Sequence, residues 1–271
     1  YFKDKFDDPM MYATAVQCVS VPTESILFNI DIEGPITKDK TAVLRVFAKM
    51  FYNHCGFYGD DLKIAKLERF IEKQGKTEQF RAVFEEVNGA PWVETRDSFA
   101  FFEDDIVEVL QSVLGMSEQA ARNWFNGEET NELSIAQLVA DIKEYVDGKG
   151  KNFRLLFMVD EVGQYIGDDG DLMINLQSLV EEIGTRCTGK VWVMVTSQEA
   201  IDSVVHISGD DFSKIQGRFN TRLSLSSSSV DEVIKKRVLA KTEEADHLLH
   251  MVYDKEHAVL KNLYTFNNPV L

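Results

Sequence analysis

The stretch Leu155–Glu161, with the sequence LLFMVDE, is a short apolar run that ends in two adjacent carboxylates. Nearly continuous apolar character over so few residues is typical of a strand that is buried in a parallel sheet. Such sheets bind ligands at the carboxyl ends of their strands. Asp160 is therefore a candidate ligand of Mg²⁺, and Glu161 a candidate for polarising an attacking water in a nucleoside triphosphatase. The alternative is a strand that leaves the sheet into solvent.

Two further apolar runs predict strands, at Ile26–Ile32 and Val191–Val195. Arg222–Leu225, in which polar and apolar residues alternate, is a weaker fourth candidate. Apolar residues at helical spacing lie between and after these runs, over Lys40–Tyr52, Leu172–Ile183 and Val230–Ala240. Strands that alternate with helices predict an α/β fold.

The strand pattern is interrupted between Gly59 and Gly148, where amphipathic helical patterns follow one another. They cover Leu62–Gln74, Glu78–Val87, Asp105–Leu114, Ser117–Asn126 and Ile135–Val146. This is more than an ordinary crossover between two strands holds. We therefore expect residues 1–58 and 149–228 to form an α/β core. Residues 59–148 are then a helical insertion, and residues 229–271 begin a helical lid.

Polar residues also follow the strand predicted at Val191–Val195. Thr196, Ser197 and Gln198 are expected at the same edge of the sheet as Asp160, where a hydroxyl or amide can hydrogen-bond a γ-phosphate or the attacking water. Thr and Ser are also favoured as helix N-caps, so capping is an equally good interpretation of this segment.

Two arginines precede the fourth strand candidate, within Lys214–Leu225. Arg218 and Arg222 are candidates for an arginine finger, which neutralises charge on the γ-phosphate of a neighbouring subunit. Arg218 is preferred, because Gly217 before it allows a tight, exposed turn. The alternative for either side chain is a solvated ion pair.

The segments Val159–Asp202 and Asp210–Leu239 resemble the P-loop ATPase component of bacteriophage-exclusion (BREX) systems, the BrxC/PglY family. The resemblance extends through the chain, and Val19–Gly34 matches the strand and helix that follow the family's phosphate-binding segment. It implies an AAA+-like P-loop NTPase core that uses ATP and Mg²⁺. It also implies a bacterial, cytoplasmic protein that works with other BREX defence proteins, including a DNA methyltransferase. DNA is expected to be contacted only indirectly or through parts of the protein outside this sequence, and an arginine finger would require a homo-oligomer.

A phosphate-binding loop of the form GxxxxGK[ST] is missing from the sequence. Gly75-Lys76-Thr77 imitates its end, but Phe70 stands where the first glycine belongs, and a helical pattern precedes it. Gly148–Lys151 (GKGK) lacks the final Ser or Thr and is expected to turn the chain into the next strand. We expect the loop to lie upstream of Tyr1. The chain alone should then bind ATP weakly or not at all.

The composition limits other functions. Lysine and arginine total 29 against 45 aspartates and glutamates, a net charge of −16 that opposes nonspecific binding to nucleic acid. No apolar window is long enough to span a membrane. Two rival functions remain open: a metal-dependent nuclease that combines Asp31 and Glu33 with Asp160, and a scaffold that binds partners without catalysis.

Overall fold

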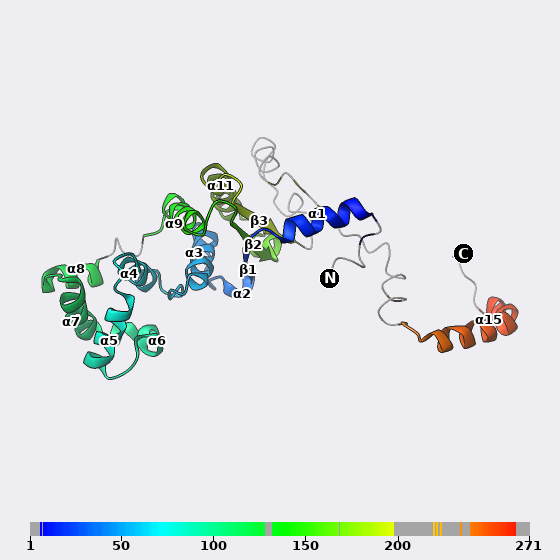
Figure 1. The fold of residues 1–271 in the computed structure, drawn as a ribbon, viewed down its shortest axis with the longest axis horizontal. Coiled ribbons are helices and arrows are strands. Elements are labelled where there is room, and N and C mark those ends of the chain that lie inside the picture. Colours follow the sequence, from blue (N-terminus) through cyan, green and yellow to red (C-terminus); the bar gives the residue numbers. More distant parts are fainter. Residues whose placement is uncertain are drawn as a thin grey trace. The chain divides into compact units, whose positions relative to one another are not determined.

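The computed structural model of the chain describes residues 6, 8–127, 132–167, 169–197, 219, 221, 223, 234 and 239–263. It divides into two compact units, Tyr1–Asn220 and Thr221–Leu271. The first unit contains a parallel sheet with helices and a series of further helices, and the second contains one described helix (Figure 1).

Three parallel strands form the sheet: β1 (Thr23–Asn29), β2 (Arg154–Asp160) and β3 (Val191–Val195), with β2 in the centre. Asn29 of β1 lies opposite Asp160 of β2, and Val159 lies opposite Val195 of β3. The predicted α/β class, with a parallel sheet flanked by helices, is therefore confirmed. The fourth strand candidate, Arg222–Leu225, lies outside the described residues except for Leu223.

The first strand ends earlier than its apolar run predicts. Instead of continuing to Ile32, the chain turns at Asn29 into the short helix α2 (Ile30–Glu33). The side-chain oxygen of Asn29 accepts hydrogen bonds from the backbone N–H groups of Asp31 (2.9 Å) and Ile32 (3.3 Å). This cap stabilises a helix start, because it satisfies donors that have no partner within the helix. Ile30 points into the core, whereas Ile32 is exposed.

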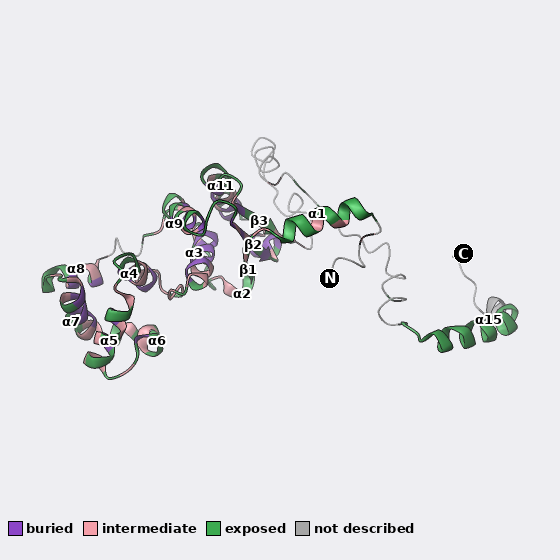
Figure 2. Cartoon of the chain, viewed as in Figure 1, coloured by how far each residue is buried: buried purple, intermediate pink, exposed green. Residues whose placement is uncertain are grey.

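One face of the sheet is covered by α3 (Ala42–His54), α9 (Ile135–Gly148) and α11 (Gly170–Cys187). Figure 2 shows the buried residues of α3 in purple. Alternate strand residues face these helices, among them Phe28 and Phe157, whose rings both lie within 5.5 Å of the ring of Phe47 on α3. Because apolar residues on alternate strand positions meet an apolar helix stripe, burial holds this half of the core together.

The other face of the sheet carries large apolar side chains in contact with solvent. Leu27 is 68% exposed, Met158 37%, Trp192 51% and Met194 46%. The strand register sets Leu27, Met158 and Met194 in one row across the three strands. We call these four residues and the half-buried Leu156 the open face.

A series of helices separates α3 from α9, as the sequence predicts, and has a hydrophobic core of its own. Its elements are α4 (Leu62–Lys73), α5 (Thr77–Asn88), α6 (Trp92–Thr95), η1 (Arg96–Phe101), α7 (Glu103–Leu114) and α8 (Glu118–Asn126). Trp92 packs edge-on against Phe80 and Phe84 at its centre. The tripeptide Gly75-Lys76-Thr77 joins two helices here rather than a strand and a helix. The Lys76 amine donates to the carbonyl of Val113, and the preceding helical pattern is present as predicted.

A buried carboxylate joins α9 to α3 and α4. Asp141 is 4% exposed, accepts a hydrogen bond from the hydroxyl of Tyr52 (2.7 Å) and forms an ion pair with Arg69. Burial and the neighbouring charge of Asp141 raise the pKa of Tyr52, which therefore stays protonated as the donor. Breaking such a buried pair by removing one partner costs about 3–5 kcal/mol.

A second polar cluster lies where β1 begins. Glu24 accepts hydrogen bonds from Tyr145 (2.6 Å) and Lys149 (3.0 Å) and lies 2.7 Å from the Nε2 atom of His54. Burial alone would raise the pKa of Glu24, but these hydrogen bonds outweigh it and lower the pKa to about 2. The cluster therefore anchors β1 to α3 and α9 while Glu24 is ionised.

Apart from the 3₁₀ helix η1, two helices contain no buried residue among the positions whose burial is described. They are α1 (Pro9–Val19), before β1, and α15 (Glu243–Leu263), in the second unit. The helical pattern predicted at Val230–Ala240 lies largely outside the described residues. None of the helices in the described part of the chain has the length and apolar character that crossing a membrane needs.

Candidate functional site

Polar side chains meet at the carboxyl ends of the three strands. Asn29 ends β1, Asp160 ends β2 and is followed by Glu161, and Thr196 follows β3. We call these four residues the carboxyl row. The parallel register brings them together, because the paired residues Asn29 and Asp160 are the last of their strands. This is the edge at which open α/β sheets bind ligands.

The carboxylate of Asp160 is exposed and is held by the neighbouring strand end. The hydroxyl of Thr196 donates a hydrogen bond to it. The position of Thr196 is determined in turn by its backbone, which donates to the carbonyl of Val159 (2.9 Å) and accepts from the N–H of Val162 (3.0 Å). Backbone hydrogen bonds at the end of the sheet therefore fix the position of Thr196, and Thr196 in turn orients Asp160.

Glu161 occupies an unusual backbone conformation, with φ of 61° and ψ of 30°. This left-handed region is uncommon for a residue with a side chain and costs about 1 kcal/mol or more. It lets the chain turn sharply from β2 into α10 (Val162–Ile166). A contact across the sheet then holds the side chain, because the amide Nδ2 of Asn29 donates to the carboxylate Oε2 of Glu161 at 2.7 Å.

The structure brings together three of the predicted site residues: Asp160, Glu161 and Thr196. Ser197 follows them, and its Oγ atom is buried without a hydrogen-bond partner among the described residues. Three other predicted site residues, Gln198, Arg218 and Arg222, lie outside the described residues. Phe219, next to Arg218, is described and packs against the sheet core.

Asn29 is the residue of this row that our sequence reasoning missed. Its side chain serves two purposes, since the oxygen caps α2 and the amide binds Glu161. The signal was a polar residue directly after the apolar residues Ile26–Phe28. It was overlooked because the strand was expected to continue through Ile32.

The carboxylates proposed for a nuclease are directed to other partners. Asp31 and Glu33 lie on α2 rather than at a strand end, so their expected position is corrected. Glu33 pairs with Lys49 at 2.8 Å, and Asp31 lies 3.8 Å from Lys38. Among the described residues, no group of three or more His, Cys, Asp or Glu side chains is arranged to hold a metal ion.

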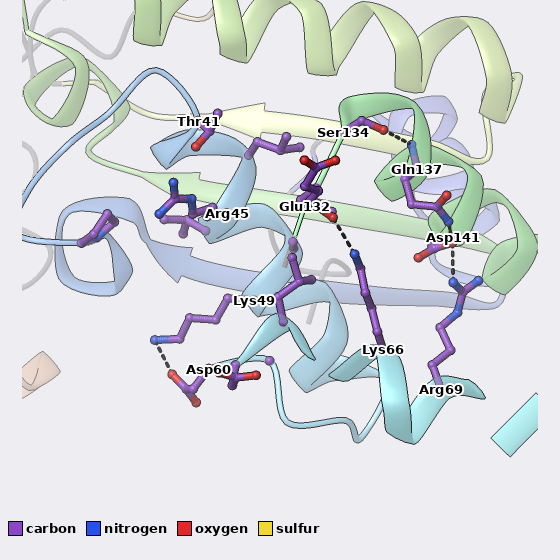
Figure 3. A pocket seen from close by; sticks show the side chains of 18 of the residues that line it. Thr41, Arg45, Lys49, Asp60, Lys66, Arg69, Glu132, Ser134, Gln137 and Asp141 are labelled. Atoms are coloured by element: carbon purple, nitrogen blue, oxygen red, sulfur yellow. Dashed lines mark hydrogen bonds and ion pairs between the residues drawn. The ribbon is translucent and has the colours of Figure 1, made fainter. Parts of the chain in front are cut away.

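A large pocket of about 1320 Å³, lined by both apolar and charged side chains, lies between α3, α4 and the start of α9 (Figure 3). No member of the carboxyl row is among the described residues that line it. Five cationic and five acidic side chains are among the described residues that line it, so their charges balance. Lys49 pairs with Glu33 and Asp60, Arg69 pairs with Asp141, and Lys66 donates to the backbone carbonyl of Glu132. The pocket therefore offers no concentrated positive charge to a triphosphate.

Two of the three cysteines, Cys55 and Cys187, are not suited to act as nucleophiles. Burial raises the pKa of Cys55 to about 12 and that of Cys187 to about 11. Both thiols stay protonated near neutral pH, as expected of cysteines that fill the core.

No protein-family model matches the chain, and no solved structure matches it. The three-stranded parallel sheet with flanking helices is compatible with a P-loop-like core.

Proposed function

We propose that this chain supplies the Mg²⁺- and water-positioning part of a nucleoside triphosphatase site. The observation that carries the proposal is the pair of contacts in the carboxyl row. Thr196 holds Asp160, and Asn29 holds Glu161, at the end of a central parallel strand. Because Asp160 and Glu161 have different partners, one can bind Mg²⁺ while the other activates the attacking water.

The roles follow from these surroundings. Asp160, exposed and in contact with a hydroxyl, is the proposed ligand of Mg²⁺, directly or through water. Glu161, held from the side by Asn29, accepts a proton from the water that attacks the γ-phosphorus, while the bond to the departing nucleoside diphosphate breaks. Asn29 acts as a positioning residue, because it touches Glu161 and not the reacting atoms.

The donors of the row fit Mg²⁺. Carboxylate, amide and hydroxyl oxygens are hard ligands, and Mg²⁺ in phosphoryl-transfer sites takes one or two carboxylates and completes its shell with water and phosphate oxygens. A row without a third carboxylate is therefore sufficient for Mg²⁺. When bound, the ion would neutralise charge on the phosphate oxygens.

The remaining parts of the site rest on the sequence. We propose that the phosphates bind a loop outside these 271 residues, and that Arg218, with Arg222 as the alternative, reaches the γ-phosphate of a neighbouring subunit. The resemblance to the BREX ATPase component supports ATP as the nucleotide and other bacterial phage-defence proteins as partners.

The test compares two variants of the full-length protein. Glu161→Gln should abolish ATP turnover while ATP still binds, because the amide cannot take the proton but the Mg²⁺ ligand is intact. Asp160→Ala should weaken binding of Mg²⁺–ATP about tenfold or more, as measured by calorimetry or by a fluorescent nucleotide. Glu108→Gln, an exposed carboxylate of α7, is the matched control and should leave turnover unchanged.

Three other results would reject the proposal. Full turnover in both site variants would remove Asp160 and Glu161 from the reaction. Metal-dependent cleavage of DNA without ATP would favour the nuclease. If the wild-type protein shows neither ATP turnover nor DNA cleavage, the scaffold function is favoured.

A further inference from the structure

Two apolar surfaces of the first unit are exposed and have no partner among the described residues. The open face of the sheet exposes Leu27, Met158, Trp192 and Met194. The helix α1 buries none of its residues and exposes Met10, Met11, Val16 and Val19. Contiguous exposed apolar surface of this kind usually marks a place where another element binds.

Five residues of α1 form an apolar stripe. Met11, Tyr12, Ala15, Val16 and Val19 follow one another at intervals of one, three, one and three residues, which places them on the same side of a helix. Met10, Thr14 and Gln17 lie on the other side. The stripe can therefore face the sheet while the polar side stays in solvent.

The connection to β1 leaves one place for this stripe. Only Ser20, Val21 and Pro22 separate the end of α1 from Thr23, and short links of this kind make a helix antiparallel to the strand that it precedes. The opposite face of the sheet is already covered by α3, α9 and α11. The open face alone remains within reach of α1.

The dimensions agree. The 11 residues of α1 span about 16 Å, and the 7 residues of β1 span about 23 Å, so the helix fits along the strand. A helix is about 10 Å wide, which matches the distance of about 10 Å across three strands. A helix centred over Met158 would thus also touch Leu27 and Met194, which flank it in the same row.

We propose that α1 docks on the open face of the sheet, antiparallel to β1, and covers Met158 and Met194. The proposal does not depend on the triphosphatase activity, because it rests only on the two apolar surfaces and the link between them. In this position α1 covers the sheet, and its first residues are directed toward the carboxyl row.

Methionine oxidation tests the docking, since it converts an accessible thioether to a sulfoxide that mass spectrometry locates. The chain contains its own references: Met10 is 77% exposed and lies off the stripe, whereas Met173 is 1% exposed. With dilute hydrogen peroxide, Met158 and Met194 should react at least about fivefold more slowly than Met10 if α1 covers them. Without docking, Met158 (37% exposed) and Met194 (46% exposed) should react within about twofold of the rate of Met10.

The variant Val16→Asp with Val19→Asp should bring Met158 and Met194 to within about twofold of the rate of Met10. Both valines are exposed when α1 is undocked, so these changes leave the fold of the sheet intact. Gln17→Asp, on the polar side of α1, is the matched control and should keep the protection.

Each other outcome overturns the proposal. Rapid oxidation of Met158 and Met194 in the wild-type chain means that the face is open. Protection that persists in the double variant means that another segment covers it. Protection that disappears on dilution means that a second copy of the chain does.

Discussion

Replacing Asn29 with alanine removes two contacts at once, and their free energies can be separated. The amide of Asn29 donates to the carboxylate of Glu161 at 2.7 Å, and its oxygen caps α2. A hydrogen bond to a charged group contributes about 1.5–3 kcal/mol, and we take about 1.5 because the pair is only partly buried. The cap adds about 1 kcal/mol. Asn29→Ala should therefore cost about 2.5 kcal/mol.

Asn29→Ser is the control, because serine caps a helix but is too short to reach Glu161. It should cost about 1.5 kcal/mol. The readout is hydrogen exchange of the β2 amides, which reports the free energy of opening of the sheet. Amides of α7, which packs in the separate helical core, should not change.

A double-mutant cycle with Glu161→Ala isolates the contact itself, and we expect a coupling energy of about 1 kcal/mol or more. In the full-length protein both Asn29 variants should also lower ATP turnover, because the carboxylate of Glu161 is no longer held. The reasoning is refuted if the coupling energy is below about 0.3 kcal/mol, or if Asn29→Ser exchanges like the wild type.

Three further substitutions test the packing that supports the site. Asp141→Asn breaks the buried ion pair of α9 and should lower the opening free energy of α9 by about 3 kcal/mol in hydrogen exchange. Glu24→Gln should cost about 1–2 kcal/mol at pH 7, discounted because a third of the side chain is exposed. Since the folded state lowers the pKa of Glu24 from 4.5 to about 2, urea titrations should show this difference shrinking as the pH falls through that range. Gly34→Ala places a Cβ atom 2.6 Å from the ring of Tyr165 and should lower the melting temperature by several degrees, whereas Gly148→Ala, with open space around it, should not.

The sequence predicted most of the secondary structure of the described residues. The runs at Leu155–Val159 and Val191–Val195 are strands, because buried parallel strands need nearly continuous apolar residues. The helices between β1 and β2 were predicted from their 3.6-residue apolar spacing alone. The error at Ile30–Ile32 arose because an apolar run does not by itself show where a strand gives way to a helix.

Asp160, Glu161 and Thr196 were predicted from the sequence because each follows an apolar strand, and local pattern is enough to place residues at strand ends. The partners of these residues were not predictable in this way. Asn29 and Glu161 are 132 positions apart, and only the parallel register of β1 and β2 sets them side by side. The contacts of Asp141 were not predictable either, because in the sequence it is one acidic residue among several on a helix. Burial among Tyr52, Arg69 and Gln137, from three different helices, makes it a structural centre, because contacts between distant segments exist only once the chain has folded.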